Sequence, residues 1–185
     1  MAHKIHRTAP QRTCTKKYSH YRSFKKYLMT DFNQRCGYCD DDDSHTGGWR
    51  FYQIDHFHPH SKGGAEHSYE NLVYSCSYCN RAKSNEWRSS EGFIDPCKIE
   101  YSDIIYRDQT GEIVHNGSAQ AKYIHESLLL SLSRHQIIWQ INRLVELKEK
   151  FRALSDQGKT EFDSDLLEIY KSLDDWVTAL RKGEQ

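Results

Sequence analysis

The fold is decided by residues 36–83, which read CGYCDDDDSHTGGWRFYQIDHFHPHSKGGAEHSYENLVYSCSYCNRAK. Two Cys-x-x-Cys pairs bound this stretch, Cys36/Cys39 and Cys76/Cys79, with 36 residues between them. Two sulfurs of one tight turn can reach the same ion, and two such turns complete a closed tetrahedron with metal–sulfur bonds of about 2.3 Å. We therefore predict a structural zinc site that closes the intervening segment into one loop. The alternatives are four reduced cysteines in a small core, or a redox pair.

Two short extended segments followed by a helix are predicted within and just after this loop. Residues 49–54 (WRFYQI) are rich in aromatic and β-branched residues and predict a strand that ends at Asp55-His56. Residues 71–74 form a second extended or turn segment, and residues 80–90 predict a helix that begins at the second cysteine pair. The four aspartates at 40–43 are interpreted as a solvated loop, because a run of like charges repels itself.

Three groups of residues stand in a fixed order along this stretch: Asp55-His56, then Glu70-Asn71, then Cys79-Asn80-Arg81-Ala82-Lys83. This order resembles the HNH endonuclease family, in the ββα-metal subclass that is stapled by two Cys-x-x-Cys pairs. The resemblance covers residues 33–88. It implies an α+β fold and an enzyme that hydrolyses phosphodiester bonds of nucleic acid, with DNA favoured.

The resemblance also implies a role for each matching residue. His56 corresponds to the general base, and Asp55 and Asn80 correspond to the ligands of a catalytic divalent ion. Asn71 corresponds to the residue that braces the loop and orients the histidine, and Lys83 to a contact with the phosphate. Many family members carry a histidine where this chain has Asn80, and ligation by oxygen alone favours Mg²⁺ or Mn²⁺ over nickel or zinc.

Two further histidines lie beside the expected site. His58 and His60 could bind a metal or a phosphate, but we interpret them as ordinary loop residues, because they precede Gly63-Gly64 in a segment without regular structure. The two cysteines outside the pairs, Cys14 and Cys97, are expected to be free thiols.

The first 30 residues are strongly basic in a chain whose net charge is zero, with eight Lys or Arg and no Asp or Glu. Residues 15–32 have helical spacing of aromatic and aliphatic side chains, so a basic helical arm is expected over residues 1–32. Such an arm indicates phosphate contacts, although a solvated helix face would have the same composition. The expected nucleic-acid contacts are Lys16, Lys17, Lys25, Lys26, Lys62, Arg81 and Lys83.

Outside the zinc-stapled core, taken as residues 33–98, two more parts are expected. Residues 99–117 predict a β-hairpin with its turn at 108–111. Residues 118–185 predict a helical extension with apolar stripes, which pack on each other, on the core or on a partner. This longer arrangement resembles HNH proteins encoded beside an ATPase in bacterial anti-phage defence, of the Septu or retron type. That resemblance implies an ATPase partner docked on the helices.

Two other functions remain open from the sequence. The chain could be a zinc-stapled module that binds nucleic acid without cutting it, or a toxin-type nuclease for RNA. The sequence has 37% hydrophobic residues, no apolar run long enough to span a membrane and no apolar signal segment at its start. We therefore expect a soluble, cytoplasmic protein without membrane contacts.

Overall fold

The computed structural model describes residues 2–157 and 162–182, and it divides into two compact units. The first unit spans Met1–Gln109 and Ile113–Ser131, and the second spans Thr110–Glu112 and Leu132–Gln185. Helices and small antiparallel sheets occur together, so the expected α+β class is confirmed.

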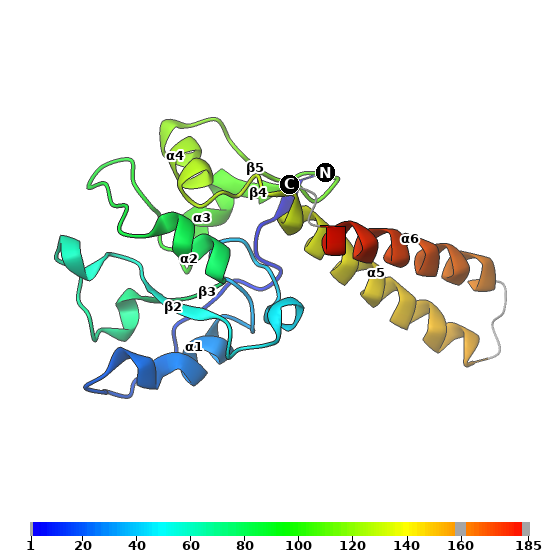
Figure 1. Cartoon of the computed structure of the whole chain (residues 1–185), viewed down its shortest axis with the longest axis horizontal. Helices are drawn as coiled ribbons and strands as arrows, with labels where there is room; N and C mark the ends of the chain where they lie inside the picture. The colour runs from blue at the N-terminus through cyan, green and yellow to red at the C-terminus, as the bar shows by residue number, and fades with distance from the viewer. Residues whose placement is uncertain (1, 158–161, 183–185) are drawn as a thin grey trace. The chain divides into compact units, whose positions relative to one another are not determined.

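The centre of the first unit is a β-hairpin followed by a helix (Figure 1). Strands β2 (Gln53–His56) and β3 (Leu72–Ser75) pair antiparallel, with Asp55 opposite Val73 and His56 opposite Leu72. Helix α2 (Ser77–Lys83) begins directly after β3, and the Sγ atom of its N-cap residue Cys76 accepts the Cys79 N–H at 3.4 Å. Every residue of β3 is buried, so the hairpin is anchored by this strand.

The first strand of this hairpin begins later than the sequence predicts. Residues 49–51 form a turn, in which the Phe51 N–H donates to the Gly48 carbonyl. Gly47 and Gly48 both have φ of +89°, a conformation that bends the chain and that suits glycine. Asp55 and His56 consequently lie inside the strand, where the ladder of β2 and β3 fixes them, and not after it.

The basic arm is helical only in its second half. It comprises β1 (His3–Lys4), a 3-10 turn η1 (Tyr21–Phe24) and α1 (Lys25–Asp31), so the helix expected from residue 15 is wrong before residue 21. The preceding segment is held instead by Asp31, whose carboxylate accepts hydrogen bonds from the Thr13 backbone N–H at 2.6 Å and from the Thr13 hydroxyl at 2.7 Å.

The region after the core is partly a hairpin. Strands β4 (Ile105–Arg107) and β5 (Ile113–His115) pair as predicted and, with β1, form a sheet of order β1-β4-β5. Residues 99–104, predicted as strand, are instead the short helix α3 (Ile99–Ile104). That helix buries Tyr101, whose hydroxyl donates to the Tyr38 carbonyl at 2.8 Å. Helix α4 (Ala119–Ser127) follows, capped by Ser118.

Three of the four consecutive aspartates are buried, which corrects the interpretation of residues 40–43 as a solvated loop. Asp40, Asp41 and Asp43 are only 4%, 2% and 5% exposed. Arg35 pairs with Asp42 at 2.9 Å, and the Tyr74 hydroxyl donates to Asp43 at 2.6 Å. Charge repulsion along the run is offset by these partners, which come from elsewhere in the chain. Three further 3-10 turns complete the loop: η2 (Asp43–Thr46), η3 (His60–Lys62) and η4 (Tyr69–Asn71).

The second unit is a pair of helices, α5 (Ser133–Ser155) and α6 (Asp163–Lys182), which pack against each other (Figure 1). Ile169 is the buried residue of α6, whereas Tyr170 beside it is 46% exposed. Residues 158–161 and 183–185 of the expected extension lie outside the described residues. No helix in the described ranges is both long and apolar enough to cross a membrane.

Candidate zinc and active sites

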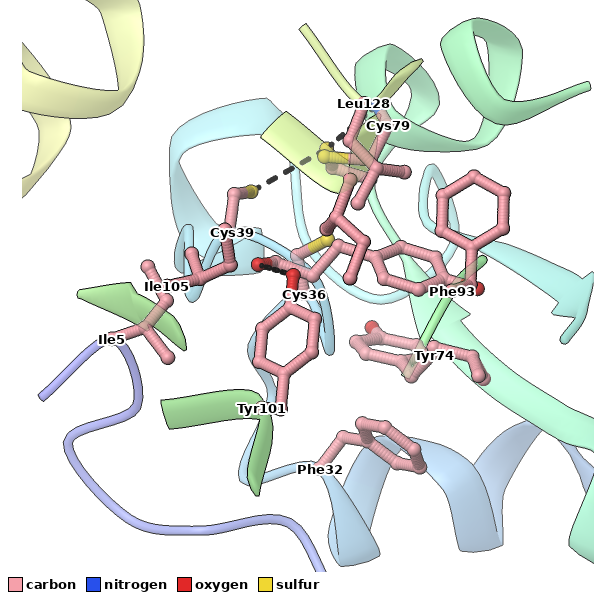
Figure 2. Packing of buried hydrophobic residues seen from close by; sticks show 14 of the residues in the cluster. Ile5, Phe32, Cys36, Cys39, Tyr74, Cys79, Phe93, Tyr101, Ile105 and Leu128 are labelled. Carbon is pink, nitrogen blue, oxygen red and sulfur yellow. Dashed lines mark hydrogen bonds between the residues drawn. The ribbon is translucent and has the colours of Figure 1, made fainter. Parts of the chain in front are cut away.

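The four paired cysteines converge at one point in the core of the first unit. Cys36, Cys39, Cys76 and Cys79 are all 0% exposed, and their sulfur atoms lie within 4.8 Å of one another. The Cys39 and Cys76 sulfurs are 3.8 Å apart, which is about the edge of a tetrahedron with 2.3 Å metal–sulfur bonds. Figure 2 shows Cys36, Cys39 and Cys79 among the side chains of the core. The donor set and its geometry fit a structural zinc ion.

The first cysteine pair is connected to the expected active site through one side chain. Tyr38 lies between Cys36 and Cys39, is 0% exposed, and donates its hydroxyl to Asp55 Oδ2 at 2.5 Å. Burial raises the pKa of the Tyr38 hydroxyl well above its ordinary value, with the Asp55 charge acting in the same direction. The hydroxyl is therefore a stable donor. Sequence reasoning missed Tyr38, because a tyrosine inside a Cys-x-x-Cys turn carries no pattern of its own.

Lys83 is not placed to contact a phosphate, which corrects the role implied by the family resemblance. Its side chain is 0% exposed, and its Nζ lies 2.9 Å from Asp55 Oδ2 and 2.9 Å from the His56 carbonyl oxygen. Burial raises the pKa of Asp55, and the Lys83 charge and the Tyr38 hydroxyl oppose that rise. Lys83 thus compensates the charge of a buried carboxylate. Both contacts use Oδ2, so Oδ1 remains as the candidate metal ligand.

The orientation of His56 identifies which ring nitrogen can act as a base. His56 Nε2 lies 2.9 Å from the Glu66 carbonyl oxygen. A carbonyl oxygen only accepts hydrogen bonds, so Nε2 carries the proton and the neutral ring keeps its lone pair on Nδ1. The Tyr21 ring packs edge-to-face on the imidazole, with the ring centroids 4.8 Å apart. His56 is therefore held by a backbone group on one side and an aromatic ring on another.

Asn71 braces the loop that supplies this carbonyl. Its Oδ1 accepts the His58 N–H at 2.8 Å, and its Nδ2 donates to the carbonyls of His58 and Ala65 at 2.9 and 3.0 Å. Asn71 thereby links His58 at the start of the loop to Ala65, the residue just before Glu66. His58 itself bonds to the Lys62 carbonyl at 2.9 Å and its ring stacks on Trp87. This agrees with the interpretation of His58 as a loop residue.

A pocket of about 430 Å³ is lined by Asp55, His56 and Asn80 together. Asn80 donates its Nδ2 to Gln53 Oε1 at 2.5 Å, so the amide oxygen of Asn80 is the atom left to bind a ligand. A carboxylate and an amide oxygen suit Mg²⁺ or Mn²⁺. The remaining lining residues are Ile54, Pro59, His60, Ser61, Arg81, Ser84 and Asn85. None of the zinc-site cysteines is among the described residues that line this pocket.

The predicted cationic contacts differ in their relation to this pocket. Arg81 lines it and is exposed, and Lys62 is exposed in η3, beside the lining residues His60 and Ser61. Lys16, Lys17, Lys25 and Lys26 do not occur among the described lining residues. Lys16 and Lys25 are engaged by aromatic rings, with Lys16 Nζ 5.2 Å from the centroid of Tyr27 and Lys25 Nζ 5.7 Å from that of Trp49.

The first unit thus contains a β-hairpin followed by a helix, with a four-cysteine cluster beside it and a histidine and a carboxylate on the first strand of the hairpin. Residues 36–86 match the family model described as HNH endonuclease, and the chain therefore carries an HNH domain. A search of curated proteins and a search of solved structures found no match.

Proposed function

We propose that this chain is a metal-dependent endonuclease that hydrolyses phosphodiester bonds, with DNA as the favoured substrate. One observation carries the proposal: the pocket combines a histidine of defined tautomer with two oxygen donors on opposite elements of the ββα unit. A module that only binds nucleic acid has no need of this combination. The match of residues 36–86 to HNH endonucleases supports the same function.

The residues of the pocket divide the chemistry among them. Asp55 and Asn80 would hold Mg²⁺ or Mn²⁺, and the bound ion would supply Lewis-acid stabilisation of charge on the phosphate. His56 Nδ1 takes a proton from water as the oxygen of that water forms a bond to phosphorus. The bond to the leaving sugar oxygen breaks, and that oxygen then takes a proton from solvent water. The Glu66 carbonyl then accepts from Nε2 of the imidazolium and stabilises its charge. Arg81, exposed at the rim, can contact the phosphate.

The test is plasmid nicking by the zinc-loaded full chain with Mg²⁺ or Mn²⁺. His56→Ala should lose at least about 100-fold in cleavage rate, the lower range for one general base. His115→Ala is the matched control, because His115 lies on β5 and not in the pocket lining. If the wild type cuts with neither metal while both proteins bind DNA equally, the non-catalytic binding function is correct. Cleavage of transfer RNA with DNA left intact would assign an RNA substrate.

The anti-phage role and the ATPase partner belong to the same proposal and rest on the resemblance of the segments beyond the core. In this proposal the paired helices α5 and α6 are the docking element. Leu167 and Tyr170, 56% and 46% exposed on α6, offer apolar contact area. Co-purification with the product of a neighbouring ATPase gene tests this part. Leu167→Glu should abolish the co-purification, and an unchanged yield would reject α6 as the docking surface.

A further inference from the structure

The turn before β2 holds an aromatic ring in a fixed and open position. Phe51 is 65% exposed, and the Cδ2–Cε2 edge of its ring lies close to Gly47. A Cβ atom at Gly47 would lie 2.8 Å from the Phe51 ring, so the ring can occupy this place only over a glycine. Single exposed apolar residues are ordinary on protein surfaces. A ring that is held along one edge and is largely open to solvent can, however, accept a flat partner.

Positive charge gathers beside this ring. Lys25 Nζ donates to the Arg50 carbonyl at 3.0 Å and lies 5.7 Å from the Trp49 ring centroid. The Arg50 guanidinium lies 5.8 Å from the same ring, and Arg50 is exposed. The turn therefore combines two aromatic rings with two cations. We call Lys25, Trp49, Arg50 and Phe51 the aromatic–cationic turn.

The acidic residues nearest before the turn in sequence are held by other groups, and Asp43 is buried. Asp42 pairs with Arg35 at 2.9 Å, and Asp43 accepts the Tyr74 hydroxyl at 2.6 Å. A surface that carries two cations and an exposed ring favours a partner with a flat face and a negative backbone. Nucleic acid has both features, because every base has a π-face and every linkage a phosphate.

The turn leads directly into the strand that carries the active site. Gln53, two residues after Phe51, accepts a hydrogen bond from Asn80 Nδ2, and Asn80 lines the pocket. Phe51 and Asp55 are four positions apart, with three residues between them, so their Cα atoms are at most about 14 Å apart even in a fully extended chain. A strand bound in the pocket can therefore reach the Phe51 ring within a few nucleotides of the cut.

We propose that the aromatic–cationic turn stacks an unpaired base of the strand that is cut, so that the substrate has a single-stranded segment beside the scissile bond. Within a regular duplex both faces of each base are covered by neighbouring bases, and Phe51 would find no free face to stack on. The inference rests on the proposed nuclease function and names its substrate class. A protein partner for the exposed ring is the competing explanation.

The test measures binding by the zinc-loaded full chain carrying His56→Ala, so that nothing is cut. Fluorescence anisotropy compares a labelled single strand with a blunt duplex of the same sequence. Phe51→Ala should weaken single-strand binding by about 5- to 100-fold, as loss of one stacked base predicts, and duplex binding by less than about twofold. Phe51→Trp should retain single-strand binding. Tyr170→Ala, a similarly exposed aromatic of the second unit, is the matched control and should change neither affinity.

Further measurements separate the possible failures. Arg50→Gln should reduce the slope of log K against log salt concentration by about 0.7 for the single strand, because one phosphate contact is lost. Two results with Phe51→Ala would overturn the inference and leave the nuclease proposal intact. One is an unchanged affinity for the single strand, and the other is an equal loss of affinity for the single strand and the duplex. A lack of cleavage by the chain with intact His56 would instead reject the nuclease proposal. Zinc content and thermal midpoint of each variant should match the parent, since Phe51 is exposed.

Discussion

Replacing Lys83 with methionine tests whether this residue belongs to the protein interior or to the substrate surface. Methionine has a similar length and fills the same space, but it removes the ammonium group from Asp55 and from the His56 carbonyl. Removing one partner of a buried ion pair costs about 3–5 kcal/mol, because the other charge stays buried without compensation. The Tyr38 hydroxyl still donates to Asp55, so we expect the lower end, about 3 kcal/mol.

The assay is chemical denaturation of the zinc-loaded protein near neutral pH, with Lys62→Met as the control. Lys62 is exposed in η3, and its replacement should change the free energy of unfolding by less than about 0.5 kcal/mol. A Lys83→Met protein as stable as the wild type, but with weaker binding of nucleic acid, would refute the ion-pair reasoning. It would support the phosphate contact that the family resemblance implies.

The same variant has a predicted pH dependence. Burial raises the pKa of Asp55 and Lys83 opposes the rise, so removing Lys83 should raise that pKa further. A carboxyl whose pKa is higher in the folded than in the unfolded state binds more protons when folded, and its contribution to stability is lost as the pH rises through the folded pKa. The destabilisation by Lys83→Met should therefore shrink as the pH is lowered toward the raised Asp55 pKa. A destabilisation that grows toward acid pH would contradict this argument.

Three other predictions concern the zinc and active sites. Removal of zinc with a strong chelator should unfold the HNH core, because a structural zinc site contributes on the order of 10 kcal/mol. If elemental analysis shows that the zinc is gone and the thermal midpoint is unchanged, this prediction is contradicted. Tyr38→Phe should keep its zinc but bind Mn²⁺ at least about tenfold more weakly, as measured by calorimetry. The reason is the loss of a hydrogen bond to the Asp55 carboxylate that is worth about 1.5–3 kcal/mol. Unchanged Mn²⁺ affinity would show that Tyr38 has no role in metal binding. Asn71→Ala loses three hydrogen bonds and should lower the free energy of unfolding by about 2–3 kcal/mol. It should also reduce kcat for DNA cleavage more than it raises KM. Full activity would show that the loop does not orient His56.

Local spacing explains why much of the site was predictable from the sequence. A Cys-x-x-Cys turn brings its two sulfurs together whatever surrounds it, and two such turns enclose a hairpin that carries Asp55 and His56. Asn80 follows Cys79 directly, so its approach to the same pocket comes from the chain itself. The roles implied for Lys83 and for the run of aspartates could not be checked in this way, because burial depends on residues distant in sequence.

The sequence by itself determined the four-cysteine site, the ββα core and the residues that meet in the pocket, since each depends on neighbours a few residues apart or on a hairpin register. Only the tertiary structure decided that Lys83 faces inward, that Tyr38 bonds to Asp55, and that three of the four aspartates at 40–43 are buried. It also placed Arg107, 68 residues along the chain from Cys39, so that its guanidinium donates to the Cys39 carbonyl at 2.6 Å. The physical reason is that a buried charge is stable only beside its partner, and packing of the whole chain selects that partner.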